Sequence, residues 1–389
     1  MKKLNSNPII NFPSFFVSKP VRVDFIAYHD LQAVAGMSVF EEMSQHFDCR
    51  WQIGPCQKPT GAEAAILLDH TQHHPEIRKS PDGYQYLFYM SHDLGDLDVY
   101  EVEKQRLRHF NIIFVPSSLH LKNAQKSLSP SYAQPSLGTK RVILEVGWPK
   151  YDRMEVPEKY DSLREQLENF SYPHTVIYAP TWAYTWEWKE ILPRLCKLQC
   201  NVIVKNHIYV NPGQAYPQGH EKTYEECLQS AKEMEEYLFS YNNPNFLVAP
   251  REINICSLFP FANVLISDQS SVTLEFLPFG ISIETGRFNP NPNQIQPQSS
   301  LVSDVIFMPI EKLNPVLESS ESFREFISQH SDAKSHNFVN RGQTPAGQLT
   351  AQLIDKYVSF WQVLTNPIKS ASAFSEMMER WREGLLTES

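Results

Sequence analysis

The chain has 389 residues, a length that usually divides into two hydrophobic cores, so two domains of roughly 150 to 200 residues are expected. Its formal net charge of −9 excludes the basic profile of a general nucleic-acid binder, and no apolar run reaches the roughly 18 residues of a membrane-spanning helix. The first residues, MKKLNSNPIINFPSFF, lack the apolar core and cleavage site of a signal peptide. We therefore expect a soluble cytoplasmic protein, one that can still lie peripherally at the inner face of a membrane.

Short apolar runs alternate with amphipathic segments in the first part of the chain. Strands are predicted at residues 21–27, 64–68, 86–90, 111–117 and 141–147, with a helix at about 31–47. Continuous apolar strands are typical of a parallel sheet that is covered on both faces. Residues 1–150 are therefore predicted to form one doubly wound, Rossmann-like domain.

The same pattern repeats in the second part, residues 151–343. Strands are predicted at residues 175–181, 201–207, 245–250, 263–268 and 305–310, and helices in WKEILPRLCKLQ and EINICSLFPFA. The fold class is thus α/β, with two domains facing a central cleft and ligands at the carboxyl ends of the strands. Residues 288–300 are predicted to be a long loop. Residues 344–389 are predicted to be helices that pack on the second domain or cross back to brace the first.

Metal binding is weighed for two groups of residues. The six cysteines form no CxxC pair and are predicted to be reduced thiols, with Cys196 and Cys200 on one face of a helix. A second group follows a predicted strand and is explained equally well as a surface loop or as zinc ligands: Asp69, His70, His73 and His74. No Asp-x-Asp pair lies near the expected cleft, so neither an essential metal nor a cofactor is predicted.

Polar residues follow three of the predicted strands. LISDQSSVTLEF ends an apolar strand in Asp268 and continues with Ser270 and Ser271 before a helical pattern begins. Small hydroxyls at this position suit a helix cap, and they also suit a phosphate site. Lys205 and His207 follow the strand NVIV; His92 follows YLFYM in the first domain.

Four runs in the second part carry a family resemblance. VGWPKYDRM, VIYAPTW, VIVKNH and ANVLISDQSSVTLEF occur in the order and rough spacing of the CDP-glycerol glycerophosphotransferase family, GT-B-type enzymes that build teichoic acids and related capsule polymers. In that family the corresponding runs look like Gly-x-Pro-Arg-x-Asp, Tyr-Ala-Pro-Thr-Trp-Arg, Lys-x-His-Pro and Ser-Asp-Tyr-Ser-Ser. The similarity covers about residues 147–284, roughly a third of the chain, and the combined set is quite specific.

The sequence departs from the family pattern at four positions. Lys150 stands where Arg is usual, Ala183 replaces the Arg after Pro-Thr-Trp, Ile208 replaces the Pro after His207, and Gln269 replaces the Tyr before the serine pair. The His-Gly motif of the family's first domain is best matched by SHDLGD. These departures put the donor and the acceptor in doubt, while the GT-B-like fold stays the expectation.

The resemblance implies a transfer of glycerol phosphate, or a related polyol phosphate, from a CDP-activated donor to a hydroxyl of a polymer or lipid-linked glycan. The acceptor hydroxyl would attack the β-phosphorus and CMP would leave. His92 is the expected base, and His207 the expected second catalytic group. The implied donor-binding residues are Thr181, Lys205, Asp268, Ser270 and Ser271.

Two other functions remain open at this point. One is a GT-B glycosyltransferase that uses a nucleotide sugar. The other is a nucleotide-binding member of a polymer-assembly complex that has lost catalysis. Trp182, Trp186 and Trp188 are predicted to line an acceptor groove or, as is more frequent for aromatic stripes, to belong to the core.

Overall fold

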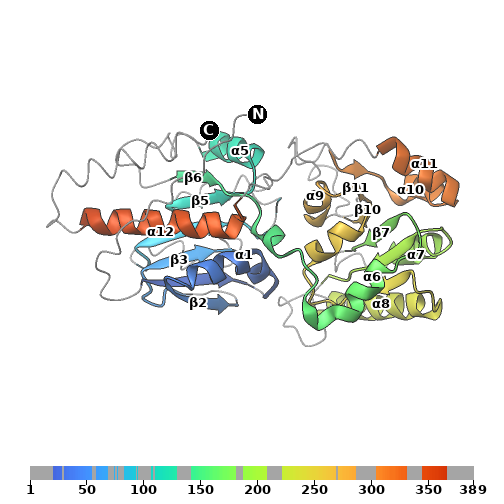
Figure 1. The fold of residues 1–389 in the computed structure, drawn as a ribbon, viewed down its shortest axis with the longest axis horizontal. Helices are drawn as coiled ribbons and strands as arrows, with labels where there is room; N and C mark the ends of the chain where they lie inside the picture. Colours follow the sequence, from blue (N-terminus) through green and yellow to red (C-terminus); the bar gives the residue numbers. More distant parts are fainter. Residues whose placement is uncertain are drawn as a thin grey trace.

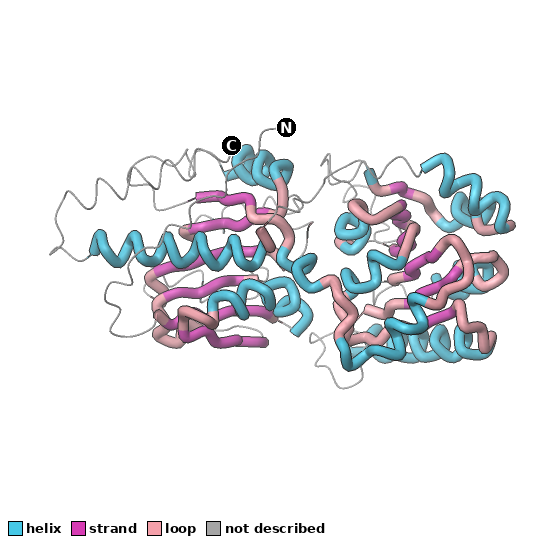
Figure 2. The backbone as a smooth tube through the Cα atoms, in the orientation of Figure 1, coloured by secondary structure: helices cyan, strands magenta, loops and turns pink. Residues whose placement is uncertain are grey.

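The computed structural model describes the chain in several segments, which together contain two parallel β-sheets (Figures 1 and 2). The described residues are 21–28, 30–54, 58–68, 74, 77, 83–92, 94, 107, 110–128, 142–180, 187–207, 221–268, 270–285, 304–330 and 344–365. The predicted loop at 288–300, the helical pattern after residue 365, and Cys56 lie outside them. Among the described helices, none is both long and apolar enough to cross a membrane.

The first sheet has six parallel strands in the order β2-β1-β3-β4-β5-β6. Its strands are β1 (Arg22–Ala27), β2 (Asp48–Ile53), β3 (Ala64–Leu67), β4 (Tyr86–Met90), β5 (Ile112–Val115) and β6 (Val142–Glu145). Helices α1 (Asp30–Met43) and α5 (Ser118–Leu128) belong to the same part of the chain. The five predicted strands are confirmed, and β3, β4 and β5 are buried along their whole length, as continuous apolar runs in a covered sheet should be.

The second sheet also has six parallel strands, in the order β12-β11-β10-β7-β8-β9. They are β7 (Thr175–Tyr178), β8 (Asn201–Val204), β9 (Phe246–Val248), β10 (Val264–Ser267), β11 (Ile281–Glu284) and β12 (Ile306–Phe307). The accompanying helices are α6 (Asp161–Glu168), α7 (Trp188–Leu195), α8 (Glu221–Ser240), α9 (Val272–Phe276), α10 (Ile310–Val316) and α11 (Ser320–His330). The α/β class with two doubly wound sheets is therefore confirmed.

Two details of the second part differ from the prediction. EINICSLFPFA does not form an α-helix: residues Ile255–Phe261 form the 3₁₀ helix η7, which contains Pro260 and is capped by the Asn254 side chain on the Cys256 amide. Cys196 and Cys200 do not share a helical face, because α7 ends at Leu195. Burial raises the pKa of the Cys200 thiol to about 12, which suits a reduced core residue.

Strand β11 begins at a close approach of two backbones. A Cβ atom on Gly280 would lie 2.2 Å from the Asn263 carbonyl oxygen, and Asn263 directly precedes β10. The next residue, Ile281, donates its amide to that same carbonyl at 2.9 Å. Only glycine fits here, so any substitution at Gly280 would push β11 away from β10.

The long helix α12 (Ala346–Thr365) returns to the first sheet (Figure 1). Ile354, Tyr357 and Val358 are buried in the same core as strands β1, β3 and β4. The contact with α1 is tight, because a Cβ on Gly347 would lie 2.5 Å from the Ser38 hydroxyl. Of the two placements considered for the C-terminal helices, α12 takes the one that crosses back to the first sheet.

A short 3₁₀ helix, η3 (Pro149–Arg153), joins the two sheets. The Ser38 hydroxyl of α1 donates to the Pro149 carbonyl at 3.2 Å, and the Asp152 carboxylate accepts the amides of Ala346 and Gly347 at 3.0 and 2.6 Å. Asp152 therefore caps the first turn of α12. η3 thus fixes the connection between α1, α12 and the second sheet.

Candidate functional site

The polar motifs of the second part lie at one edge of its sheet. Ser270 and Ser271 follow β10, and Lys205 and His207 follow β8. Strand β7 lies between β10 and β8, and all three run parallel. At about 4.8 Å between neighbouring strands, the two strand ends are about 10 Å apart. This edge is where ligands bind in open α/β sheets.

The hydroxyls of Ser270 and Ser271 contribute little to capping of α9. The Val272 amide lies 3.4 Å from Ser270 Oγ, which is a long hydrogen bond. Ser271 is the capping residue by position, yet its side chain accepts no capping hydrogen bond in the described structure. Backbone carbonyls accept the next amides instead: Thr273 N donates to the Ser270 carbonyl at 3.1 Å, and Leu274 N donates to the Ser271 carbonyl at 3.0 Å. The serine hydroxyls are therefore weak caps of α9, and their contact with the donor phosphates stays a prediction.

Asp268 is buried, with 2% of its surface exposed, at the end of β10. The Ser267 hydroxyl donates to the Ala179 carbonyl at 2.6 Å and lies 3.3 Å from Asp268 Oδ1, so its single hydrogen serves the carbonyl first. A buried carboxylate repels a phosphate, so direct contact with the donor suits a hydroxyl of the ligand better. The predicted contact between Asp268 and the donor stays a prediction.

Two further acidic side chains lie near the end of β10, and the sequence analysis did not identify them. Burial, and secondarily the charge of Asp268, raise the pKa of Glu284 at the end of β11 to about 7. Glu187, at the start of α7, accepts the Thr285 hydroxyl through Oε2 at 2.9 Å. Glu284 ends the unpredicted strand β11, so only recognition of that strand would have shown its position. The residues that the structure describes contain no group of three or more His, Cys, Asp and Glu arranged to hold a metal ion.

Lys205 is buried, and its ammonium points at backbone oxygens. Nζ donates to the carbonyls of Asn206 at 3.1 Å and Arg251 at 2.9 Å. Burial lowers the Lys205 pKa to about 7; the Glu252 charge opposes this shift and the Arg251 charge adds to it. These contacts favour a positioning role, in which Lys205 fixes the segment leading to the half-buried His207. The predicted contact between Lys205 and the donor stays a prediction.

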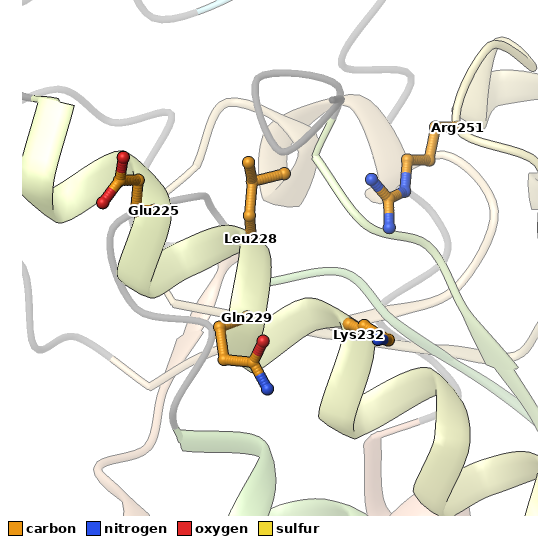
Figure 3. A pocket seen from close by; sticks show the side chains of 5 residues that line it. All are labelled: Glu225, Leu228, Gln229, Lys232 and Arg251. Atoms are coloured by element: carbon orange, nitrogen blue, oxygen red, sulfur yellow. The ribbon is translucent and has the colours of Figure 1, made fainter. Parts of the chain in front are cut away.

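A polar network extends from Lys205 to the surface. Glu235 of α8 accepts from Asn206 Nδ2 at 2.6 Å and from the Arg251 guanidinium at 2.8 Å. Arg251 also borders a cavity of about 290 Å³ beside α8, shown in Figure 3, which is lined by Glu225, Leu228, Gln229, Lys232 and Arg251. Both cations of this cavity already have acidic partners, Arg251 with Glu235 and Lys232 with Glu236. We assign this cavity no role in the candidate site.

His92 follows β4 of the first sheet and is half-buried. Two residues later, Leu94 is buried in an apolar cluster with Trp148 and Val305. The same cluster contains Leu274 of α9 and Leu277, which directly follows α9. The loop that carries His92 is thereby held against the segment that follows Ser270 and Ser271. Segments that follow β4 of the first sheet and β10 of the second sheet therefore pack against each other.

The predicted donor residue Thr181, the possible metal cluster at Asp69–His74 and the tryptophan stripe take no described place at the candidate site. Thr181, Trp182, Trp186 and most of the Asp69–His74 cluster lie outside the described residues. His74, the described member of that cluster, is buried. Trp188 does not line a groove: it is the first residue of α7 and is buried in the core of the second sheet, with Nε1 donating to the Ser230 hydroxyl of α8 at 3.1 Å.

The change from Arg to Lys at position 150 keeps a cation at the domain junction. Lys150 Nζ pairs with the Glu275 carboxylate of α9, whose side chain is 1% exposed. Asn254 holds the adjoining backbone through the Lys150 carbonyl at 3.2 Å. This departure from the family pattern thus falls in a structural contact between η3 and α9.

Comparisons with known proteins agree on the fold. No protein-family model matches the sequence, and no curated protein matches it. Among solved structures, the wall teichoic acid polymerase TagF aligns with a TM-score of 0.53 at 14% identity, covering 88% of this chain and 89% of that one. The UDP-GlcNAc 2-epimerase from Neisseria meningitidis, bound to UDP-GlcNAc, aligns with a TM-score of 0.55 at 12% identity, covering 86% and 100%. MnaA of S. aureus, with UDP, gives 0.55 at 9% identity, covering 88% and 97%. These similarities show the GT-B fold.

Proposed function

We propose that this chain is a transferase that moves glycerol phosphate, or a related polyol phosphate, from a CDP-activated donor to a hydroxyl of a cell-surface polymer or its precursor. The observation that carries the proposal is the packing of Leu94, from the His92 loop, against Leu274 and Leu277. It supports a site in which a histidine from the first sheet faces the serine pair of the second. The similarity to TagF, a teichoic acid polymerase by name, supports the choice of donor.

In the proposed reaction the acceptor oxygen forms a bond to the β-phosphorus of the donor while the bond from that phosphorus to the CMP oxygen breaks. His92 takes the proton that the acceptor hydroxyl loses. The hydroxyls of Ser270 and Ser271, and the predicted contribution of Thr181, hold the donor phosphates through hydrogen bonds to charged oxygens. His207, when protonated, stabilises the negative charge on the departing CMP.

Other groups of the site orient these residues. Lys205 bridges the carbonyls of Asn206 and Arg251 and so supports the segment that ends at His207. Asp268, buried at the end of β10, orients the turn into the serine pair. The proposed acceptor is a polymer or a lipid-linked glycan, and the proposed location of the activity is the cytoplasm, peripherally at the inner face of the membrane.

A second candidate function is a GT-B enzyme that acts on a nucleotide sugar. It is favoured by the similarity to structures that contain UDP-GlcNAc and UDP. In this alternative the same serine pair binds the diphosphate of the sugar nucleotide. The third candidate, a nucleotide-binding protein without catalysis, would bind a donor and leave it intact.

A donor panel separates the three candidates. Thermal shifts are measured with CDP-glycerol, CDP-ribitol, and UDP-, GDP- and CMP-sugars, and the release of the nucleotide product is then followed for each donor that binds. The proposal predicts stabilisation by a CDP-polyol and release of CMP in the presence of a polymer acceptor. Turnover of a sugar nucleotide, without turnover of either CDP-polyol, would support the second candidate. Binding of a donor without release of any product would support the third.

A further inference from the structure

His120 links the first turn of α5 to the loop that carries His92. Its side chain is buried, and the residue is 1% exposed. Nε2 lies 2.9 Å from the carbonyl oxygen of Leu94, and Nδ1 lies 2.7 Å from the hydroxyl oxygen of Ser117. The imidazole therefore spans two segments that are 26 residues apart in the chain.

The partners of the ring assign its hydrogen. A carbonyl oxygen accepts and never donates, so the bond to Leu94 requires a hydrogen on Nε2. In the neutral imidazole the other nitrogen then accepts, and the Ser117 hydroxyl can donate to Nδ1. Ser117 is buried two residues after the end of β5, where it fixes the orientation of the ring. The ring in turn fixes the Leu94 backbone.

Leu94 is held from two sides. Its carbonyl accepts from His120 inside the first part of the chain, while its side chain packs with Trp148, Leu274 and Leu277. Residue 94 thus cannot shift toward either side without losing a buried hydrogen bond or an apolar contact. His92 lies two residues earlier, between this anchor and the end of β4 at Met90.

We propose that His120 is a positioning residue that holds the His92 loop in place through the hydrogen bond from Nε2 to the Leu94 carbonyl. The inference rests on the proposed function, in which His92 takes a proton from the acceptor. Small displacements of a reacting group of about 1 Å can lower a rate by about 10²-fold. The hydrogen bond from His120 to Leu94 therefore affects the rate of transfer. It does not affect the affinity for the donor nucleotide, which binds at the second sheet.

The test uses two substitutions of the same residue in the full chain. His120→Leu keeps the bulk of the side chain and removes the donor. His120→Gln keeps an N–H donor that can reach the Leu94 carbonyl. His46, an exposed histidine after α1, supplies the control His46→Leu. For each variant the donor dissociation constant, the single-turnover rate with CDP-glycerol and an acceptor, and the denaturant midpoint are measured.

The expected result is a separation of rate from binding. His120→Leu lowers the single-turnover rate at least tenfold and changes the donor dissociation constant less than about twofold. His120→Gln recovers most of the rate, and His46→Leu equals the wild type. A purely structural role would lower the denaturant midpoint and leave the rate of the folded fraction unchanged. Equal rates for His120→Leu and the wild type would overturn the proposal.

Hydrogen exchange separates this inference from the proposed function, because it needs no turnover. Amides of a peptide covering residues 90–94 should exchange at least tenfold faster in His120→Leu than in the wild type, and His120→Gln should restore protection. If the wild type turns over no donor, the proposed function fails and the catalytic consequence of His120 fails with it, while faster exchange would still establish the anchor. Unchanged exchange in His120→Leu would overturn the anchor itself.

Discussion

Lys150 and Glu275 form a buried ion pair across 125 residues of sequence, with Nζ 2.7 and 2.8 Å from the two carboxylate oxygens. The Lys150 side chain is 15% exposed and the Glu275 side chain 1%. The Tyr151 hydroxyl also donates to the Glu275 carbonyl, and the Cys256 thiol lies 3.6 Å from Oε2. The pair therefore connects the joint between the two sheets with α9, which directly follows Ser270 and Ser271.

Removing the cation of this pair should destabilise the protein strongly. Lys150→Met leaves the Glu275 carboxylate buried without its counter-charge, and we expect a loss of about 3 kcal/mol in the free energy of unfolding. The double variant Lys150→Met with Glu275→Leu should lose less than the sum of the single changes, since no charge is left buried. Urea denaturation of all three variants gives the coupling energy.

Lys232→Met, in an exposed pair with Glu236, is the control and should change stability by less than about 0.5 kcal/mol. A coupling energy below about 0.5 kcal/mol for the buried pair would contradict this account.

The cap of α12 gives a second prediction. Asp152→Ala removes the acceptor for the amides of Ala346 and Gly347, which should cost about 1 kcal/mol of stability. The loss should be local, with faster hydrogen exchange in the first turn of α12 and unchanged exchange in the second sheet. Glu318→Ala, which changes an exposed acidic residue, serves as the control. Equal protection of α12 in the Asp152 variant and the wild type would show that the cap is not needed.

The strands were the most predictable part of the fold. Ten of them read as continuous apolar runs, because both faces of each sheet are covered. Strand β2 was missed since its sequence, DCRWQI, is polar at alternate positions and only partly buried at the edge of the sheet. Strand β11 was missed because ISIE alternates apolar and polar residues and is not a continuous apolar run, although its Ser282 is buried.

The candidate site was predictable only as far as local pattern reaches. Ser270, Ser271 and Lys205 follow apolar strands, so their edge of the sheet could be inferred. Their partners could not, because the Arg251 carbonyl that Lys205 contacts lies 46 residues away, beyond any periodic signal. The anchor at His120 and the pair at Lys150 are likewise tertiary contacts. Nothing in the local sequence distinguishes such residues from ordinary surface polar groups.

The serine pair should affect donor binding more than stability. We expect Ser270→Ala with Ser271→Ala to raise the donor dissociation constant at least about tenfold, because a hydrogen bond to a charged group contributes about 1.5 to 3 kcal/mol. The melting temperature should fall only slightly, since the capping contact from the Val272 amide to Ser270 Oγ is 3.4 Å long. Calorimetric titration and thermal melts of the variant measure both quantities, with the exposed Ser240→Ala as the control. Unchanged donor affinity together with a large loss of stability would favour the capping interpretation.

The buried ammonium of Lys205 predicts a pH dependence of stability. Burial lowers its pKa from 10.5 to about 7 in the folded state, so between these values the unfolded chain binds the proton more strongly than the folded chain. Stability contributed by this residue therefore rises with pH from about 7 to about 10, by at most about 1.4 kcal/mol per pH unit. The unfolding free energy of the wild type minus that of Lys205→Met should therefore increase as the pH rises through this window. Lys312→Met, at an exposed site, is the control. A difference that is constant or falls with pH would show that the ammonium is solvated.

The central claim is that His92 and the second sheet form one active site, and a single-turnover experiment tests it most directly. CMP release from CDP-glycerol is followed in the wild type, His92→Ala and His207→Ala, with the donor dissociation constant measured for each and the exposed His46→Ala as the control. We predict that His92→Ala lowers the rate about 10² to 10⁴-fold with donor affinity nearly intact, because a positioned base contributes about that much. His207→Ala should weaken both donor binding and rate. A His92→Ala variant that releases CMP at the wild-type rate would contradict the account.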